Sequence, residues 1–163
     1  MASLSDHNQI RTYRTDALRQ RGLWLRGHRK HTIKNLVGCI NTRLQACGVT
    51  HVGHTLTDNL TIQGQPARGN MNGPGWCMEL NGSFNECRTT NAYFMLLAGT
   101  VYHEARHAEQ RFRVAQIVGQ NVIQLNTHGR PVHEYIAVPT RVLQDATRAA
   151  IPTFPVQHVV EAW

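Results

Sequence analysis

The sequence predicts an α+β fold in which helices dominate and a small sheet lies beside one long helix. Residues 92–120 contain no proline and space their apolar residues at helical intervals. Two shorter helical stretches precede them, and short strand-like segments fall between residues 50 and 87. A chain of 163 residues is long enough for one real core. We therefore expect residues 1–163 to form a single domain, with a basic helical segment at 1–50 and a core at 51–163.

The elements before the long helix follow from local signals. Residues 6–21 and 31–47 read as helices, and Gly48 is placed to end the second. Residues 50–64 carry a weak strand signal, and residues 64–75 are a loop by composition. We expect a hairpin at 76–87 that turns at Asn81-Gly82. The alternating apolar residues behind the strand signal are Val52, Leu56, Leu60 and Ile62.

The long helix is expected to have one buried face and one open face. Thr89, Thr90 and Asn91 are candidate N-caps. At about 100° per residue, one stripe is continuously apolar and can pack into a core. The stripe contains Phe94, Leu97, Ala98, Val101, Ala105, Ala108, Phe112 and Ala115. The opposite face contains Ala92, Leu96, Gly99, His103, His107 and Gln110.

After the long helix the sequence predicts shorter elements. Residues 126–131 read as a turn, and a short segment follows at 132–137. Pro139 suits the first turn of a helix that runs to about residue 150. Pro152 and Pro155 then break the chain before a last segment at 156–163.

The open face of the long helix carries the motif His-Glu-Ala-Arg-His at 103–107. Residues four apart on a helix lie about 40° apart around the axis, so His103 and His107 can bind one metal ion. Glu104 lies at the flank of this face, where it could hold a water molecule. Two imidazoles, an open position and a carboxylate are the parts of a zinc hydrolase. We expect Zn²⁺ as the cofactor and Glu104 as the general base.

The stretch 101–116 resembles the active-site helix of zincin metallopeptidases. More narrowly, Tyr-His-Glu-Ala-Arg-His-Ala-Glu-Gln at 102–110 resembles the zincin-like toxin domains of bacterial polymorphic toxins and type VI secretion effectors. Weaker similarity lies in 75–81 and 138–146. The resemblance implies a zinc metallopeptidase that is a secreted or delivered effector. It also implies a protein or peptidoglycan-peptide substrate, an immunity protein and a secretion-machinery carrier as partners, and action in the periplasm or in the cytoplasm of a recipient cell.

The third metal ligand stays open, because no Gly or His follows His107 at the metzincin spacing. A catalytic zinc usually has three protein ligands. Glu134 has a spacing near that of the gluzincins, and Glu161 loosely matches a glutamate before a tryptophan in the toxin-like zincins. These two are alternatives for the third ligand. The wider set of downstream candidates is His128, His133, Glu134, Asp145, His158 and Glu161.

Other side chains have candidate roles around the metal. Gln110 could orient a ligand imidazole, or it could simply be a polar residue of the helix. Tyr135 and His158 are unranked candidates for stabilising the oxyanion. Gly99 leaves room one turn before His103 for a substrate or a strand.

The positive charge is concentrated in the first third of the chain. Residues 1–50 hold nine Lys or Arg against two Asp, whereas residues 51–163 hold eight basic and eight acidic groups. Such a segment can bind an anionic partner or be a solvated face. No nucleic-acid motif accompanies it, so we expect no specific nucleic acid. Because the N-terminus is polar, we expect no signal peptide, and no apolar run is long enough to span a membrane.

The four cysteines, Cys39, Cys47, Cys77 and Cys87, lack the spacing of a zinc or redox motif. Across the expected hairpin, Cys77 and Cys87 could form a disulfide or stay free.

The sequence leaves three classes of function open. The first is a zinc metallopeptidase effector, and the second is a zinc peptidase or amidase with a housekeeping role. The third is a non-catalytic binding module that uses the basic segment and carries a vestigial motif.

Overall fold

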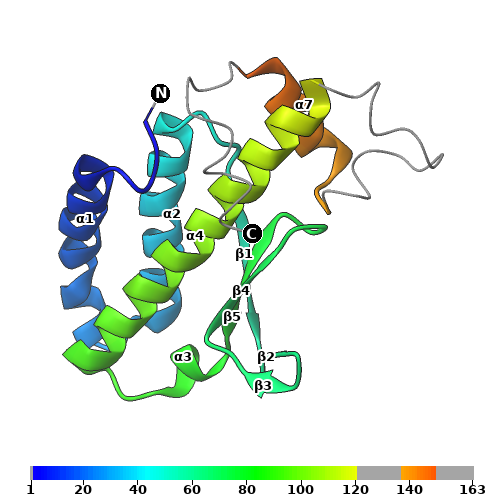
Figure 1. Cartoon of the computed structure of the whole chain (residues 1–163). Coiled ribbons are helices and arrows are strands. Elements are labelled where there is room, and N and C mark those ends of the chain that lie inside the picture. The colour runs from blue at the N-terminus through cyan, green and yellow to red at the C-terminus, as the bar shows by residue number, and fades with distance from the viewer. Residues whose placement is uncertain (1, 121–136, 150–163) are drawn as a thin grey trace.

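A computed structural model describes residues 2–120 and 137–149. It shows the predicted α+β class: helices α1 (His7–Leu25), α2 (Arg29–Ala46), α3 (Ser83–Glu86), α4 (Asn91–Gln120) and α7 (Thr140–Arg148), with five short strands. Helix α4 runs diagonally across the molecule, with α1 and α2 to one side and the strands to the other (Figure 1). It contacts both groups as well as α7, and is therefore the element around which the core is built.

The apolar stripe predicted for α4 is confirmed. All eight of its residues are buried, and six of them are completely inaccessible to solvent. The helix begins as expected: Thr90 accepts a hydrogen bond from the Tyr93 N–H at its Oγ1, 3.3 Å away. Burial of this stripe fixes the rotation of α4 about its axis. It thereby directs the opposite face, with both histidines, towards solvent.

The two N-terminal helices are also confirmed, with small shifts at their ends. Helix α1 continues beyond the predicted end at residue 21, because Trp24 is fully buried and its Nε1–H donates to Thr90 O at 2.9 Å. Helix α2 ends at Ala46, with Cys47 as its C-cap, and Gly48 stops the helix as predicted. Gly48 has φ +71°, its N–H donates to Gln45 O, and the Val49 N–H donates to Leu44 O, both at 2.9 Å. These two bonds form a Schellman motif.

The main sheet has the strand order β1-β5-β4, formed by β1 (Gly53–Thr57), β5 (Cys77–Asn81) and β4 (Gly69–Asn72). Strand β1 is parallel to β5, with Gly53 opposite Cys77, and β4 is antiparallel to β5, with Met71 opposite Met78. A second, two-stranded sheet pairs β2 (Thr61–Ile62) with β3 (Gln65–Pro66). Strand β4 is thus an edge of the main sheet, on the side that contacts α4.

Two sequence predictions about this region are wrong. The stretch 64–75, predicted to be a loop, contains β3 and β4. Strand β4 reads Gly-Asn-Met-Asn and has Met71 as its one buried residue, so it carries no alternating apolar signal. The weak signal at 50–64 corresponds to β1 and β2.

The hairpin predicted to turn at Asn81-Gly82 is also absent, because the chain enters α3 there. The Asn81 Oδ1 accepts the Ser83 N–H at 3.0 Å, and Gly82 has φ −56°, which a type I′ turn does not allow. The antiparallel hairpin instead joins β4 to β5. Consequently Cys77 and Cys87 do not face each other across a hairpin, and all four cysteines are free.

The last described element, α7, agrees with the prediction that a helix starts after Pro139. It packs against the C-terminal part of α4, where a Cβ on Gly119 would lie 3.3 Å from Leu143 Cδ1. The predicted turn at 126–131 and the last segment at 156–163 lie outside the described residues. The short segment at 132–137 does so as well, except for its final residue. None of the described helices is both long and apolar enough to cross a membrane.

Candidate metal and catalytic site on α4

The two histidines of the motif lie side by side on the exposed face of α4. Their Nε2 atoms are 3.1 Å apart, and the rings meet edge to face with centroids 4.6 Å apart. Two nitrogens that bind one zinc ion tetrahedrally, at about 2.0–2.1 Å each, lie about 3.3 Å from each other. His103 and His107 are therefore already arranged as a pair of ligands, and this donor pair fits Zn²⁺.

Gln110 fixes the orientation of one of these rings. Its Oε1 lies 3.1 Å from His107 Nδ1, one helical turn further along the same face. An amide oxygen only accepts hydrogen bonds, so the contact places the imidazole proton on Nδ1 and leaves the Nε2 lone pair for a metal. Partial burial lowers the pKa of His107, which favours the neutral form that binds metals. Of the two roles open to Gln110 in the sequence, the structure places it as the hydrogen-bond partner of His107.

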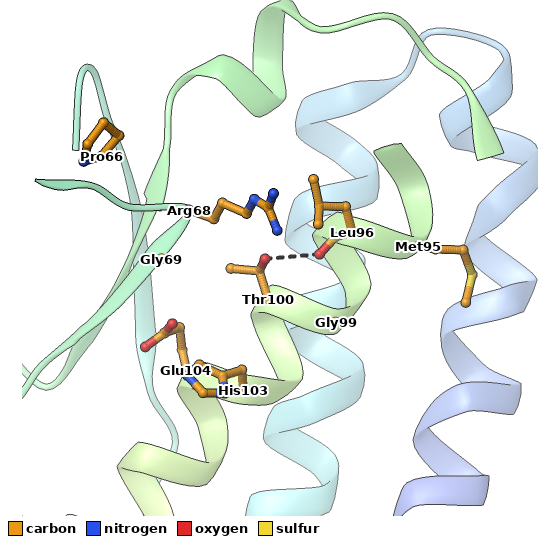
Figure 2. A pocket seen from close by; sticks show the side chains of 9 residues that line it. All are labelled: Pro66, Arg68, Gly69, Met95, Leu96, Gly99, Thr100, His103 and Glu104. Atoms are coloured by element: carbon orange, nitrogen blue, oxygen red, sulfur yellow. Dashed lines mark hydrogen bonds between the residues drawn. The ribbon is translucent and has the colours of Figure 1, made fainter. Parts of the chain in front are cut away.

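Glu104 points from α4 towards the strands of the sheet (Figure 2). Only 5% of the residue is exposed, and this burial raises the pKa of its carboxyl from 4.5 to about 7. The backbone N–H of Met71 donates a hydrogen bond to the carboxylate and partly offsets the rise. The result is a carboxyl group that can both accept and release a proton near neutral pH.

The sheet reaches Glu104 through its edge strand. Gly69, at the start of β4, lies so close to α4 that a Cβ there would be 2.7 Å from Thr100 Cγ2 and 2.9 Å from Glu104 Oε1. The Asn81 N–H donates to Arg68 O at 2.9 Å, which anchors this end of β4 to β5. Since the Met71 N–H is directed to Glu104, it lies on the outer side of β4. Glu104 is therefore held between its own helix and the strand edge.

A cleft of about 580 Å³ opens beside His103 and Glu104. Its helix side is formed by Met95, Leu96, Gly99 and Thr100, and its strand side by Pro66, Arg68 and Gly69. The Thr100 hydroxyl is turned back to its own helix, donating to Leu96 O at 2.9 Å (Figure 2). No atom comes within 4 Å of where a Cβ on Gly99 would lie, so the room predicted before His103 is present.

The structure brings together three of the predicted site residues, His103, Glu104 and His107. The alternatives for the third ligand, Glu134 and Glu161, lie outside the described residues, as do His128, His133, Tyr135 and His158. Asp145 is described. It accepts a hydrogen bond from the Thr50 hydroxyl at 3.0 Å, on a helix that packs near Gly119. That point is about 24 Å along α4 from His103, at about 1.5 Å per residue.

Asp145 is accordingly no partner for the histidines. Within residues 2–120 and 137–149, no three His, Cys, Asp or Glu side chains are grouped so as to hold a metal ion. A third protein ligand to complete a metal site with His103 and His107 would have to lie outside these ranges.

Sequence reasoning missed the residues that the sheet supplies to the site, namely Arg68, Gly69 and Met71. A glycine within a loop-like composition was the one available signal, and it does not distinguish a close approach to a helix from an ordinary turn. The role of Met71 is carried by its backbone N–H, which every non-proline residue possesses.

Comparisons with protein-family models, with curated proteins and with solved structures give no match to this chain.

Proposed function

We propose that this protein is a zinc-dependent metallopeptidase in which Glu104 is the general base. The observation that carries the proposal is the 3.1 Å separation of the His103 and His107 Nε2 atoms, on the same helix as the adjacent residue Glu104, whose buried carboxyl has its pKa raised to about 7. If the two histidines were unrelated residues on an exposed helix, their Nε2 atoms would not have to lie together. Nor would a carboxylate have to be buried against a strand. Together they supply the metal ligands and the base of peptide hydrolysis.

In this proposal His103 and His107 would hold the metal, with Glu134 or Glu161 as the third ligand. Zinc, when bound, lowers the pKa of water and polarises a carbonyl group. Glu104 accepts the proton of the attacking water at its carboxylate and later delivers it to the leaving amine. The Met71 N–H keeps the carboxylate in position, and the contact of Gln110 with Nδ1 would keep Nε2 of His107 available to a bound ion.

A peptide substrate is supported by the position of β4. This strand is at the edge of the sheet, next to Glu104 and the cleft. Apart from the Met71 N–H, which is engaged by Glu104, the outer side of such an edge can pair with an extended peptide by main-chain hydrogen bonds. A substrate bound in this way would run along β4 and pass the catalytic carboxylate.

The resemblance of residues 102–110 to zincin-like toxin domains supports the role of a secreted bacterial effector. The substrate would then be a protein or a peptidoglycan peptide, and the partners an immunity protein and a secretion-machinery carrier. Expression of the chain with and without export to the periplasm tests this role. An effector should arrest growth in one compartment, and the Glu104→Gln variant should not. Equal growth in both compartments would contradict the effector role and leave a housekeeping peptidase.

The metal itself is tested by elemental analysis of purified protein. We expect about one zinc per chain in the wild type and almost none in the His103→Ala/His107→Ala double variant. Glu104→Gln should keep the zinc and lose peptidase activity by about a hundredfold or more. Absence of zinc even after its addition would contradict the proposal and favour the binding module. Salt-dependent nucleic-acid binding, lost when Arg26, Arg29 and Lys30 are neutralised, would then be the measurement for that alternative.

A further inference from the structure

The cleft beside Glu104 contains a cationic side chain in a largely uncharged surrounding. Arg68 precedes β4, and its side chain extends from the strand side towards Leu96 on α4 (Figure 2). Leu96 and the exposed Met95 make the helix wall apolar, and Gly99 leaves it without a side chain. The cleft therefore offers an apolar wall and a guanidinium group at a short distance from the proposed reaction centre.

The charge of Arg68 is not neutralised within the described part of the chain. The ion pairs found there join Arg19 to Asp16 and Arg113 to Glu109, and neither involves Arg68. The neighbouring acid on the sheet, Glu79, is engaged by the side-chain amides of Asn70 and Asn72, at 2.7 and 2.8 Å. The guanidinium group is thus left facing the cleft.

The position of Arg68 is nevertheless well fixed through its backbone. Its carbonyl oxygen accepts the Asn81 N–H at 2.9 Å, and the Asn81 side-chain amide donates to Ala67 O at 2.8 Å. Both bonds anchor the residue to the end of β5. A cation whose backbone is anchored beside an apolar wall can discriminate between ligands of different charge.

We propose that Arg68 is a specificity-determining residue that binds a carboxylate of the substrate, next to an apolar side chain lying on Leu96 and Met95. The inference rests on the proposed peptidase function, because it assigns the substrate class of that same site. Guanidinium groups bind carboxylates through two parallel hydrogen bonds, which an ammonium group cannot reproduce. The carboxylate can belong to an acidic side chain or to the C-terminus of a peptide.

The two carboxylate sources are separated with three synthetic peptides of one apolar sequence. The first is amidated and carries glutamine, the second is amidated and carries glutamate, and the third carries glutamine with a free C-terminus. We expect the wild type to cleave one of the two acidic peptides about tenfold faster, in kcat/KM, than the uncharged one. Which of the two is preferred identifies the source.

The variant Arg68→Gln should lose this preference, so that its kcat/KM values for the acidic and the uncharged peptides become equal. Arg14→Gln is the matched control, since Arg14 is an exposed residue of α1, on the other side of α4 from the strands (Figure 1). It should retain the full preference. Arg68→Glu should invert the preference towards a peptide that carries lysine in place of glutamate. Equal kcat/KM for acidic and uncharged peptides in the wild type would overturn the proposal.

A binding measurement separates failure of this inference from failure of the peptidase function. Fluorescence anisotropy of the labelled peptides with the Glu104→Gln variant needs no turnover. We expect the preferred acidic peptide to bind about tenfold more tightly than the uncharged one, more weakly at high salt, and without preference once Arg68→Gln is added. Selective binding without cleavage by the wild type would keep the Arg68 site and reject the peptidase. Cleavage without selective binding would reject the Arg68 site and keep the peptidase. If the protein neither binds nor cleaves the peptides, both proposals are rejected.

Discussion

Gly69 and Glu104 are in such close contact that position 69 admits no side chain without displacing the carboxylate. A Cβ on Gly69 would lie 2.9 Å from both Cγ and Oε1 of Glu104. The glycine thus allows β4 to approach α4 closely enough for the Met71 N–H to reach the carboxylate. The burial that raises the pKa of Glu104 and the hydrogen bond that positions it both follow from this one approach.

The first prediction concerns Gly69→Ala. The added methyl group would meet Thr100 and Glu104, so we expect a loss of about 1–3 kcal/mol in the free energy of unfolding and at least a tenfold loss of peptidase activity. Gly38→Ala is the control, because no atom lies within 4 Å of a Cβ at that exposed position of α2. It should raise stability by about 0.5–1 kcal/mol and leave activity unchanged. Urea denaturation measures the stability of both variants, and a peptidase assay measures their activity. Wild-type stability and activity of Gly69→Ala would contradict the close contact.

The second prediction concerns the pH dependence of stability in the metal-free protein. Burial raises the pKa of Glu104 to about 7 in the fold, above the value near 4.5 of an unfolded chain. The protonated form is therefore favoured by folding. The contribution of Glu104 to stability is fully present below pH 4.5 and is lost as the pH rises through 7.

Glu104→Gln removes this titration, because glutamine stays neutral. After chelation of metals, we expect the variant to be more stable than the wild type by about 1–2 kcal/mol at pH 8, allowing for partial solvation, and nearly equal to it at pH 4. Glu86→Gln, on the exposed face of α3, serves as the control and should show no such difference. A stability gap that is independent of pH would contradict the burial of a titrating carboxyl.

The helices could be predicted from the sequence because their signals are local. The eight apolar residues of α4 recur at helical intervals, and Gly48 ends α2 through a single backbone conformation. The pairing of β4 with β5 is not local in this sense, since Met71 is the one buried residue of β4. The composition of that stretch resembles a loop, and only its neighbours make it a strand.

The same distinction applies to the site. His103, Glu104 and His107 could be predicted because four-residue spacing on a helix brings two side chains together. Arg68 and Gly69 act through their contact with α4, which depends on how the sheet packs. The spacing of residues in the sequence does not indicate such a contact, so these two residues could be identified only from the fold.

The third prediction concerns a buried pair that attaches the N-terminal residues to α4. Glu109 accepts the Leu4 N–H at 2.9 Å and lies 3.4 Å from the Arg113 guanidinium, and both charged residues are buried. Removing one member of a buried pair costs about 3–5 kcal/mol. We expect this loss for Glu109→Ala in urea denaturation, against less than about 0.5 kcal/mol for Glu86→Ala. Equal stabilities of the two variants would contradict a structural role for Glu109.

The last prediction concerns zinc affinity and follows from the contact between His107 and Gln110. Because the Gln110 oxygen holds the proton on Nδ1, the Nε2 atom of His107 faces the same point as that of His103. Without this contact the ring must be oriented and its tautomer selected at the moment of binding. We expect Gln110→Ala to weaken zinc binding by about 10–100-fold, measured by competition with a chelator.

Gln110→Glu should restore or strengthen binding, since a carboxylate accepts the same hydrogen bond. Gln45→Ala, at an exposed position of α2, should bind zinc as the wild type does. If Gln110→Ala binds zinc as tightly as the wild type, the contact has no part in preparing the site, and Gln110 is simply a polar residue of the helix.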